Sequence, residues 1–413
     1  MGLHRFRPAP SGRMGTLWTL APIRQAVLLE FGCMGHMLYA HSALNRVGVH
    51  QGSCKLYSTH IDEADISLGG TERFARAVAD IVTRDNPPVI FVLPSSVPEM
   101  IGTDLPAICE ELQPDYPDTL LLPFGCGGFN MGQHRGVQEA LLTLARSLPV
   151  DAPPTEVPTF NIIGSCADLF RFHADAGEIL RLMEGAFGMK PLCIMTSDTT
   201  VGQLQQMGGA HINLVLRQEG VPAAMHLEER FGTPYLSARP YGIRGTRAWL
   251  DRVAELLHVP LDRSFADGQA AEIRRLTAPA AGVFQHAVQT RRDEMHLSAG
   301  GHADVVKGIV SFGCGELSFP KGACWCDSPE MAEEELPCLA EDQWTQCVAE
   351  QKKGLLMASG EALEWAGRNG ELQIANPDVK WRLNPYESPL VGFRGAANLA
   401  TLWVNEVLGG RQD

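Results

Sequence analysis

The 413-residue sequence lacks several features that would place it in a functional class at once. Its apolar stretch from Leu17 to Phe31 is interrupted by Pro22, Arg24 and Glu30, so it is neither a membrane span nor the apolar core of a signal peptide. No Walker A sequence is present, and any ATP hydrolysis therefore belongs to a partner. We expect a cytoplasmic protein with no membrane partner.

Basic residues are outnumbered by acidic ones. The chain holds 34 lysines and arginines against 48 aspartates and glutamates, a formal net charge of -14, which argues against nucleic acid as a partner. The chain is too long for one compact core and suggests two or three domains. Its eleven cysteines, without a secretory signal, predict buried thiols rather than a disulfide framework, with a minority as candidate iron–sulfur ligands.

Cysteine is absent where a paired site would need it. The segment Phe31-Gly-Cys-Met-Gly35 places Cys33 on a glycine-flanked turn that opens into a helical run. No cysteine precedes it, and Ser96 stands where a second one would be sought downstream. A lone thiol can be a core residue, a nucleophile or one corner of a metal cluster completed by a partner chain. Its spacing alone favours a buried thiol.

The residues that are present alternate between short apolar strands and polar-capped helices. This alternation predicts an α/β fold with doubly wound parallel sheets. A proline-rich linker at 149–158 and a break near 265 divide the chain into three Rossmann-like domains, 1–155, 156–265 and 266–413. The predicted strands are 88–94, 119–124, 160–164, 191–195, 211–216, 306–312, 354–358 and 371–375, and the predicted helices are 104–111, 133–148, 173–186, 222–231, 244–257 and 395–408.

Several turn segments, taken in order, resemble the nitrogenase component 1 superfamily. Each is weak alone, but together they cover nearly the whole chain. They are Phe31-Gly-Cys-Met-Gly35, Asp62-Glu-Ala-Asp-Ile-Ser-Leu-Gly-Gly70, Asn86-Pro-Pro-Val-Ile-Phe-Val92, Val97-Pro-Glu-Met-Ile-Gly-Thr-Asp104, Phe124-Gly-Cys-Gly-Gly-Phe129, His211-Ile-Asn-Leu-Val215, His226-Leu-Glu-Glu-Arg-Phe-Gly-Thr-Pro234 and Ser388-Pro-Leu-Val-Gly-Phe-Arg-Gly-Ala-Ala-Asn398.

The resemblance implies an assembly as well as a fold. It implies three Rossmann-like domains, an α2β2 heterotetramer with a homologous α-type subunit, and a homodimeric ATP-dependent iron–sulfur reductase as electron donor. ATP would be used only by that reductase. These partners are expectations that the resemblance carries, and composition does not supply them.

The resemblance also assigns metal positions. Cys33 matches the second of three cluster cysteines and Ser96 falls on the third, so the chain looks like the one-ligand side of an interfacial iron–sulfur cluster, 4Fe–4S or P-cluster-like. Gly32 and Gly35 would let the backbone approach inorganic sulfide. The positions that hold the active-site cofactor in catalytic relatives fall on Arg217 and Val391, which implies a β-type partner without that cofactor.

Other thiols have weaker claims to a metal. Packing is favoured over ligation for Cys54 and Cys126, which lie near the expected site in sequence. Cys324-Trp-Cys326 is the densest thiol region, but its Cys-x-Cys spacing is not that of a zinc ribbon, and we interpret it as core or an insertion. Alkoxide ligation by Ser96 is the less favoured reading of that residue, whose default role is to satisfy a turn.

Two functions follow, with a third kept for contrast. The preferred hypothesis is a β-type subunit of a nitrogenase-like reductase that relays electrons to a site in its partner, for reductive C–S cleavage of methylthio-alkanes. The shorter N-terminus and absent C-terminal extension favour that enzyme over nitrogenase and the dark chlorophyll enzyme. The alternative is a non-catalytic N-type scaffold for nitrogenase cofactor assembly. A periplasmic-type binding protein would need an export signal, and it would leave the ordered segments unexplained.

Overall fold

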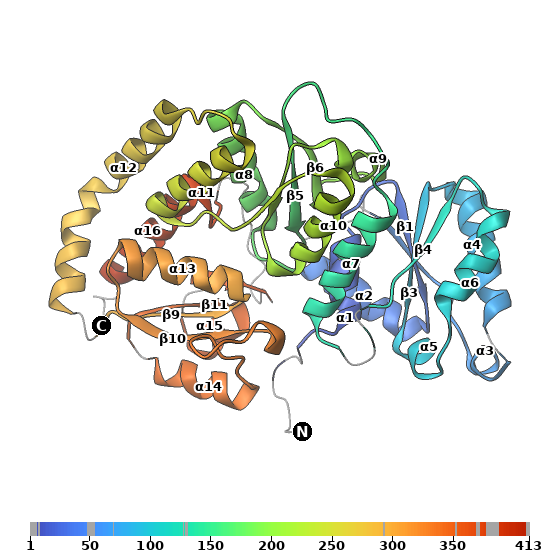
Figure 1. The fold of residues 1–413 in the computed structure, drawn as a ribbon. Coiled ribbons are helices and arrows are strands. Elements are labelled where there is room, and N and C mark those ends of the chain that lie inside the picture. Colours follow the sequence, from blue (N-terminus) through green and yellow to red (C-terminus); the bar gives the residue numbers. More distant parts are fainter. Residues whose placement is uncertain are drawn as a thin grey trace.

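Three parallel sheets of four strands each, flanked by helices, form the molecule (Figure 1). The structure is a computed structural model that describes residues 6, 9–47, 54–68, 70–126, 128, 131–291, 294–351, 353–368, 372–376 and 388–409. The sheets follow one another along the chain, and each is doubly wound, which confirms the predicted α/β class. The first strand of every sheet is interior, so the chain crosses to one side of it and then to the other.

The first sheet has the order β2-β1-β3-β4, with Phe31 of β1 opposite Pro94 of β3. Both central strands are buried along their whole length, as apolar strands covered by helices on both faces must be. Its strands are β1 (Ala26–Phe31), β2 (Lys55–Ser58), β3 (Val89–Pro94) and β4 (Leu120–Pro123), and the helices of this region are α1 (Gly12–Leu20), α2 (Met34–Arg46), α3 (Glu63–Leu68), α4 (Thr71–Asp85), α5 (Ser96–Met100), α6 (Leu105–Leu112), η1 (Gln113–Asp115) and α7 (Gln133–Ser147).

The second sheet repeats this order as β6-β5-β7-β8. Its central strand β5 is buried throughout, and the linker at 149–158 forms neither helix nor strand, as predicted. Its strands are β5 (Thr159–Ser165), β6 (Lys190–Thr196), β7 (Ile212–Val215) and β8 (Tyr235–Ser237), with α8 (Phe172–Phe187), α9 (Val201–Gln205), η2 (Met207–Gly209), η3 (Gln218–Gly220), α10 (Val221–Phe231) and α11 (Gly242–Leu257).

The third sheet has the same order again, β10-β9-β11-β12. Its strands are β9 (Leu297–Gly301), β10 (Lys321–Cys326), β11 (Leu355–Ser359) and β12 (Gln373–Ala375), and the helices are α12 (Arg263–Thr290), α13 (Ala303–Glu316), η5 (Pro329–Met331), α14 (Glu341–Glu350), α15 (Gly360–Trp365) and α16 (Gly392–Gly409). The predicted domain boundaries fall between the sheets, but α7 packs on α10, and α16 packs on α8, α11 and α12. The exact boundaries stay a prediction.

One predicted strand is wrong. Residues 306–312 lie inside α13, and the strand of this region is the preceding β9, Leu297–Gly301. The apolar run of 305–312 is buried with helical spacing at Val305, Val306, Ile309 and Phe312. In the sequence, the β-branched residues of this run favour a strand and hide the helical spacing. The helix begins after His302, which accepts a hydrogen bond from the Asp304 backbone N–H.

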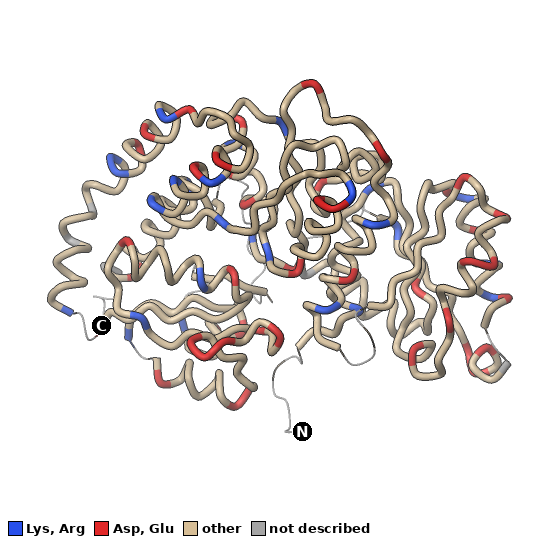
Figure 2. The backbone as a smooth tube through the Cα atoms, viewed as in Figure 1, with Lys and Arg blue, Asp and Glu red and all other residues tan. Residues whose placement is uncertain are grey.

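None of the described helices is both long enough and apolar enough to span a membrane. Acidic residues occur on the outer helices of all three regions, and basic residues are interspersed among them (Figure 2). This distribution agrees with the acidic balance of the sequence.

Candidate functional site

Cys33 lies at the topological switch point of the first sheet, where doubly wound folds bind ligands. It directly follows β1 and occupies the N-cap position of α2, and its thiol makes no capping hydrogen bond. Ser95 and Ser96 follow the neighbouring strand β3, and the Ser95 N–H donates to the Phe31 carbonyl at 2.9 Å. The structure therefore brings Cys33 and Ser96 to the same edge of the sheet.

This edge retains polar atoms without partners. The Cys33 side chain is half-buried, and the buried Ser95 Oγ and His36 Nδ1 have no hydrogen-bond partner. The other ring nitrogen of His36, Nε2, lies 2.9 Å from Ser96 Oγ and ties α2 to α5. Burial lowers the pKa of His36, which favours its neutral form. A thiol, a neutral imidazole and an unpartnered hydroxyl thus share one small area.

The two glycines beside Cys33 differ in their surroundings. A Cβ on Gly32 would lie 2.4 Å from Ser95 Oγ, so packing against β3 admits no side chain there. The Gly32 N–H donates to Thr59 Oγ1 at 3.1 Å and is engaged within the chain. A Cβ on Gly35 would meet nothing within 4 Å. Gly32 therefore fixes the turn, and Gly35 leaves open space beside it.

The two helices that begin at this edge carry exposed apolar side chains, which we call the exposed apolar rim and define as Met34, Leu38, Tyr39, Met100 and Ile101. These side chains are 50% to 69% exposed and come from α2 and from the end of α5. Clustered large apolar side chains on a surface mark an interaction site more often than scattered ones do. The rim therefore has the character of a surface that another chain covers.

A cluster bound at this edge would find one protein ligand in this chain. Among the residues that the structure describes, no group of three or more metal-ligating side chains includes Cys33. The half-buried thiol, the unpartnered atoms beside it and the space over Gly35 fit an iron–sulfur cluster completed from outside. The residues thus fit the one-ligand side that the family resemblance implies, and the ligand assignment itself stays a prediction.

The other thiols of the first sheet are placed differently. Cys54 precedes β2 at the opposite edge of the sheet, and its thiol lies 3.0 Å from the Ala26 carbonyl oxygen. Cys126 follows β4 at the carboxyl edge, but it is only 1% exposed and packs in the main core. Burial raises the pKa of both thiols, which opposes the thiolate that a metal needs. Packing, which the sequence favoured, describes both residues.

Cys324 and Cys326 lie on β10, in the third sheet. The Cys326 thiol is buried and lies 3.2 Å from the Ser328 carbonyl oxygen. Burial raises the pKa of both thiols. No metal-ligating group of three or more includes either thiol within the described part of the chain. Their placement agrees with a core role.

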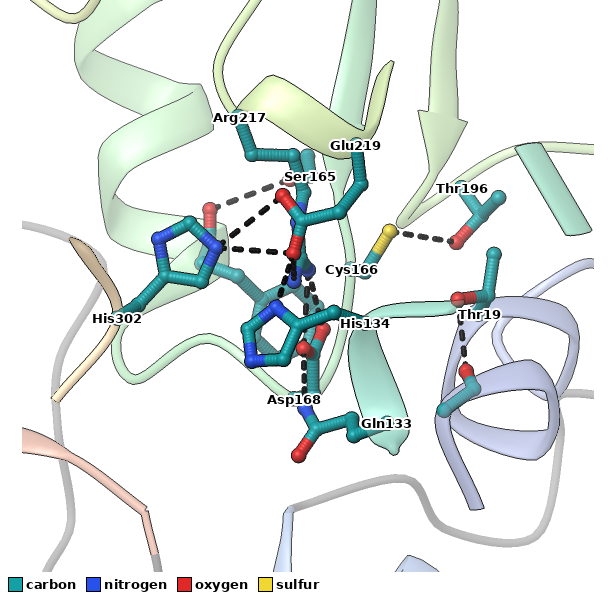
Figure 3. A network of polar contacts seen from close by, with 12 residues as sticks. Thr19, Gln133, His134, Ser165, Cys166, Asp168, Thr196, Arg217, Glu219 and His302 are labelled. Carbon is teal, nitrogen blue, oxygen red and sulfur yellow. Dashed lines mark hydrogen bonds and ion pairs between the residues drawn. The ribbon is translucent and has the colours of Figure 1, made fainter. Parts of the chain in front are cut away.

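A second polar centre, the three-domain junction, fills the switch point of the second sheet (Figure 3). Arg217 follows β7, and its side chain is fully buried. Its guanidinium binds both carboxylate oxygens of Asp168, which follows β5, at 2.7 and 2.9 Å. It also binds Glu219 of η3 at 2.7 and 3.1 Å. One buried cation thus holds two buried carboxylates.

Histidines from the other two regions complete the junction. His134, in the first turn of α7, places Nδ1 2.5 Å from Glu219 Oε1, and His302, after β9, places Nε2 3.1 Å from the same oxygen. Burial opposes a charge on His134, but hydrogen bonds to Asp327 and Glu219 outweigh it and raise its pKa to about 10. The junction therefore links all three sheets through one carboxylate.

The junction is better described as a network of paired charges than as a metal site. Among the described residues, His134, Glu219 and His302 are the group whose ligand atoms lie close enough for a metal ion. Arg217 already binds both oxygens of that carboxylate, and a fixed cation there opposes a second one. Burial would raise the pKa of Glu219, but Arg217, His302 and His134 hold it well below its usual range. Paired charges explain the arrangement.

The active-site cofactor of catalytic relatives does not fit this chain. At the two positions that the resemblance assigns to its ligands stand Arg217, whose guanidinium is paired, and Val391, which is 1% exposed and packs in the core. A guanidinium and an isopropyl group offer no lone pair to iron. No step is therefore derived through such a cofactor in this chain.

Comparison with known proteins agrees with the fold. A sequence model of the family "Nitrogenase component 1 type Oxidoreductase" matches residues 11–310. The nitrogenase iron-molybdenum cofactor biosynthesis protein NifE of Klebsiella pneumoniae is 27% identical over 262 residues, 60% of this chain and 55% of that protein. NifE of Bradyrhizobium diazoefficiens is 26% identical over 210 residues, 49% of this chain and 36% of that protein.

A relative with another printed activity also matches. It is one of the subunits of the light-independent protochlorophyllide reductase of Heliobacterium modesticaldum, and it is 27% identical over 196 residues, 47% of this chain and 37% of that protein. The chain spans about half or less of the length of the curated relatives it matches. Their activities therefore do not transfer to it directly.

A solved structure extends the likeness over the whole chain. The structure titled "Nitrogenase Cp1 at pH 6.5" superposes with a TM-score of 0.76 at 17% identity, covering 99% of this chain and 95% of that one. At that identity the match shows the fold alone. Because the family model covers residues 11–310 and the fold agrees throughout, the chain belongs to the nitrogenase component 1 type oxidoreductase family.

Proposed function

We propose that the chain is the β-type subunit of a nitrogenase-like reductase and that Cys33 gives one ligand to an iron–sulfur cluster at its interface with a homologous α-type subunit. The observation that carries the proposal is a half-buried thiol at a switch point, with no set of co-ligands among the described residues. A thiolate is the usual protein ligand of these clusters. Because one thiol cannot hold a cluster, the remaining ligands come from the second chain.

The exposed apolar rim supports a protein partner at this place. Leu38 of α2 and Met100 of α5 are 69% and 68% exposed, and these two helices begin at the edge that carries Cys33. Covering the rim removes water from the thiol and buries apolar surface, at roughly 25 cal/mol for each Å². The homologous subunit is the proposed occupant, in an α2β2 assembly of the kind that the family resemblance implies.

Within this chain the residues position and shield the cluster. The hydrogen bond from the Gly32 N–H to Thr59 and the close packing of Gly32 on Ser95 fix the turn. Cys33 is therefore in position before a cluster binds. When bound, the cluster supplies one-electron chemistry. We propose that electrons reach it from a homodimeric ATP-dependent iron–sulfur reductase and that substrate is reduced in the partner subunit. Arg217 and Val391, as described above, cannot hold an active-site cluster here.

Reductive C–S cleavage of methylthio-alkanes is the proposed reaction. A cofactor-assembly scaffold is the second candidate, and a specific observation favours it: several relatives carry the printed name of a cofactor biosynthesis protein. A scaffold would use the same one-thiol edge without turning over substrate. The neighbouring genes would distinguish the two candidates. Genes of sulfur metabolism would favour the reductase, and genes of cofactor assembly would favour the scaffold.

The ligand assignment is tested by anaerobic purification of the chain co-expressed with the proposed homologous subunit. Iron per heterodimer and the EPR spectrum are measured for wild type, Cys33→Ala and the control Cys54→Ala, a half-buried thiol at the opposite edge of the same sheet. We expect iron loss and an altered spectrum only in Cys33→Ala. Unchanged iron and spectra in that variant would remove Cys33 from the cluster.

The choice between reductase and scaffold needs a turnover measurement. The purified complex is mixed with the ATP-dependent donor, ATP and a methylthio-alkane, and release of the thiol and the alkane is followed. Thiol formation that depends on ATP and on the donor supports the reductase. Iron of only about four per heterodimer, without turnover, would instead support a complex with no large active-site cluster.

A further inference from the structure

A cavity that borders the three-domain junction, because Arg217 is among its lining residues, lies between the second and third sheets. It has a volume of about 260 Å³ and is lined by the ends of β7 and β8 and by the first turns of α13. Ser237, Ala238, Arg239 and Tyr241 come from the β8 side, and Asp304 and Lys307 come from α13. The elements that form it are thus carboxyl ends of strands and a helix N-terminus, where folds of this class bind small ligands.

Two buried donors on its wall lack hydrogen-bond partners. Tyr241 is 5% exposed and the Arg239 side chain is 4% exposed. The two side chains interact with each other, but no hydrogen bond of good geometry reaches the Tyr241 hydroxyl or Arg239 Nε. The other Arg239 nitrogens are engaged, with Asp175 and with the Leu216 carbonyl. Buried donors without acceptors are rare in folded proteins, and each calls for an explanation such as a bound ligand.

The chemistry of the wall selects an acceptor-rich ligand. Burial raises the pKa of the Tyr241 hydroxyl, which therefore keeps its proton and remains a donor. Lys307 stands at the solvent side, with its side chain 41% exposed and its ammonium 2.6 Å from Glu333. Asp304 is the acidic group of the lining, and it accepts from the Gln218 N–H at 2.8 Å. Donors outnumber acceptors on this wall.

We propose that this cavity is a binding site for a small oxyanion, phosphate or a short-chain carboxylate, held by Tyr241 Oη and Arg239 Nε and attracted by Lys307. A volume of about 260 Å³ lies below the roughly 300–1,000 Å³ of drug-sized pockets, so a nucleotide is too large. An oxyanion satisfies both donors at once and forms charge-assisted hydrogen bonds with them. The site does not depend on the function proposed for the Cys33 edge.

The neighbouring charges set how strongly it binds. Asp175 already neutralises Arg239, and Glu333 pairs with Lys307. The attraction is therefore local and hydrogen-bonded rather than that of a wide positive patch. An anion should displace the exposed Lys307–Glu333 pair, which is worth little in water, and not the buried Arg239–Asp175 pair.

The test uses the full-length chain, with phosphate and succinate as separate probes in calorimetric titrations. The variant Tyr241→Phe removes one hydroxyl and keeps the ring that packs against Gly308. We expect binding about tenfold weaker in this variant, equivalent to about 1.4 kcal/mol. The matched control Tyr235→Phe, on β8 and outside the cavity lining, should bind like wild type.

A second variant separates a specific site from general charge effects. Lys307→Gln should weaken binding and reduce its dependence on salt, and circular dichroism confirms that each variant is folded. Tighter binding of phosphate or of succinate identifies the source of the oxyanion. Two results would overturn the proposal and mean that the cavity holds only water. One is the absence of saturable binding below about 10 mM for both probes, a threshold of about 3 kcal/mol. The other is equal binding by Tyr241→Phe and wild type.

Discussion

The first and second sheets share one strand order but differ in what fills their switch points. In the first, Cys33 follows β1 with a half-buried thiol, and the buried Ser95 Oγ beside it has no partner. In the second, Asp168 follows β5 and Arg217 follows β7, and the two are joined by paired hydrogen bonds. A switch point whose polar groups are paired within the chain stabilises the fold, whereas a switch point that keeps unpaired polar groups is suited to binding a partner.

The largest expected effect comes from breaking the saturated switch point. Arg217→Met should lower the free energy of unfolding by roughly 3–5 kcal/mol, because Asp168 and Glu219 would remain buried without their cation. Denaturant unfolding of the full chain measures it. The control Arg263→Met removes an exposed pair with Asp251 and should leave the unfolding midpoint unchanged. A loss in Arg217→Met no larger than in the control would refute the pairing.

Distorting the incomplete switch point should have a smaller effect. Gly32→Ala places a Cβ 2.4 Å from Ser95 Oγ and should cost about 1–3 kcal/mol of unfolding free energy, as overpacking does. It should also displace Cys33, so iron in the complex should fall with stability. Thermal unfolding and iron content are measured on the same preparation. Wild-type values for both would mean that the contact with β3 does not fix the turn.

Gly35→Ala sharpens the comparison, because it changes the neighbouring glycine where there is open space. Its Cβ meets nothing within 4 Å, and Gly35 lies in the first turn of α2. The chain alone should therefore gain up to about 1 kcal/mol of stability from helix propensity. If the partner subunit fills that space, association with it should weaken. Calorimetry of the isolated chain and co-purification with the partner report the two effects, and a destabilised isolated chain would contradict the first.

Ser96→Ala should have the smallest effect on the iron content of the complex. Ser96 Oγ is hydrogen-bonded to His36 Nε2 at the start of α5. Loss of this bond should lower the free energy of unfolding by about 0.5–1.5 kcal/mol, as for other partly exposed hydrogen bonds. Iron content should stay at the wild-type value, because the turn role of this hydroxyl is favoured over alkoxide ligation. Loss of iron equal to that of Cys33→Ala would make Ser96 a ligand.

Sequence reasoning captured strands such as β3 and β5, whose short apolar runs are explained by burial on both faces, but it did not predict β1, β2, β8, β9 or β10. It misread 306–312, where the helical spacing of α13 was hidden by β-branched residues and where Gly300 and Gly301 disguised β9. Glycine carries no hydrophobic signal, so a strand rich in it cannot be recognised by pattern. The error therefore has a local cause and leaves the fold class intact.

The roles of Cys33 and Ser96 were proposed from the family resemblance of their turn segments and stay a prediction, whereas the three-domain junction was not predicted. Its groups come from residues 134, 168, 217, 219 and 302, and no short spacing links them. Each follows a strand or begins a helix at a carboxyl edge, which is the one signal that could have selected them. Arg217 also depends on Gly164, with φ near 91°, where a Cβ would lie 2.6 Å from its Cγ.

The junction of Figure 3 also bears on how the chain can move. Glu219 makes hydrogen-bond contacts with His134 of α7 and with His302 at the start of α13. Opening a hinge between any two sheets would therefore remove partners from a buried charge. Domain closure around a ligand, the usual response of multi-domain binding proteins, is thereby made costly. We therefore expect the three sheets to move together as one block.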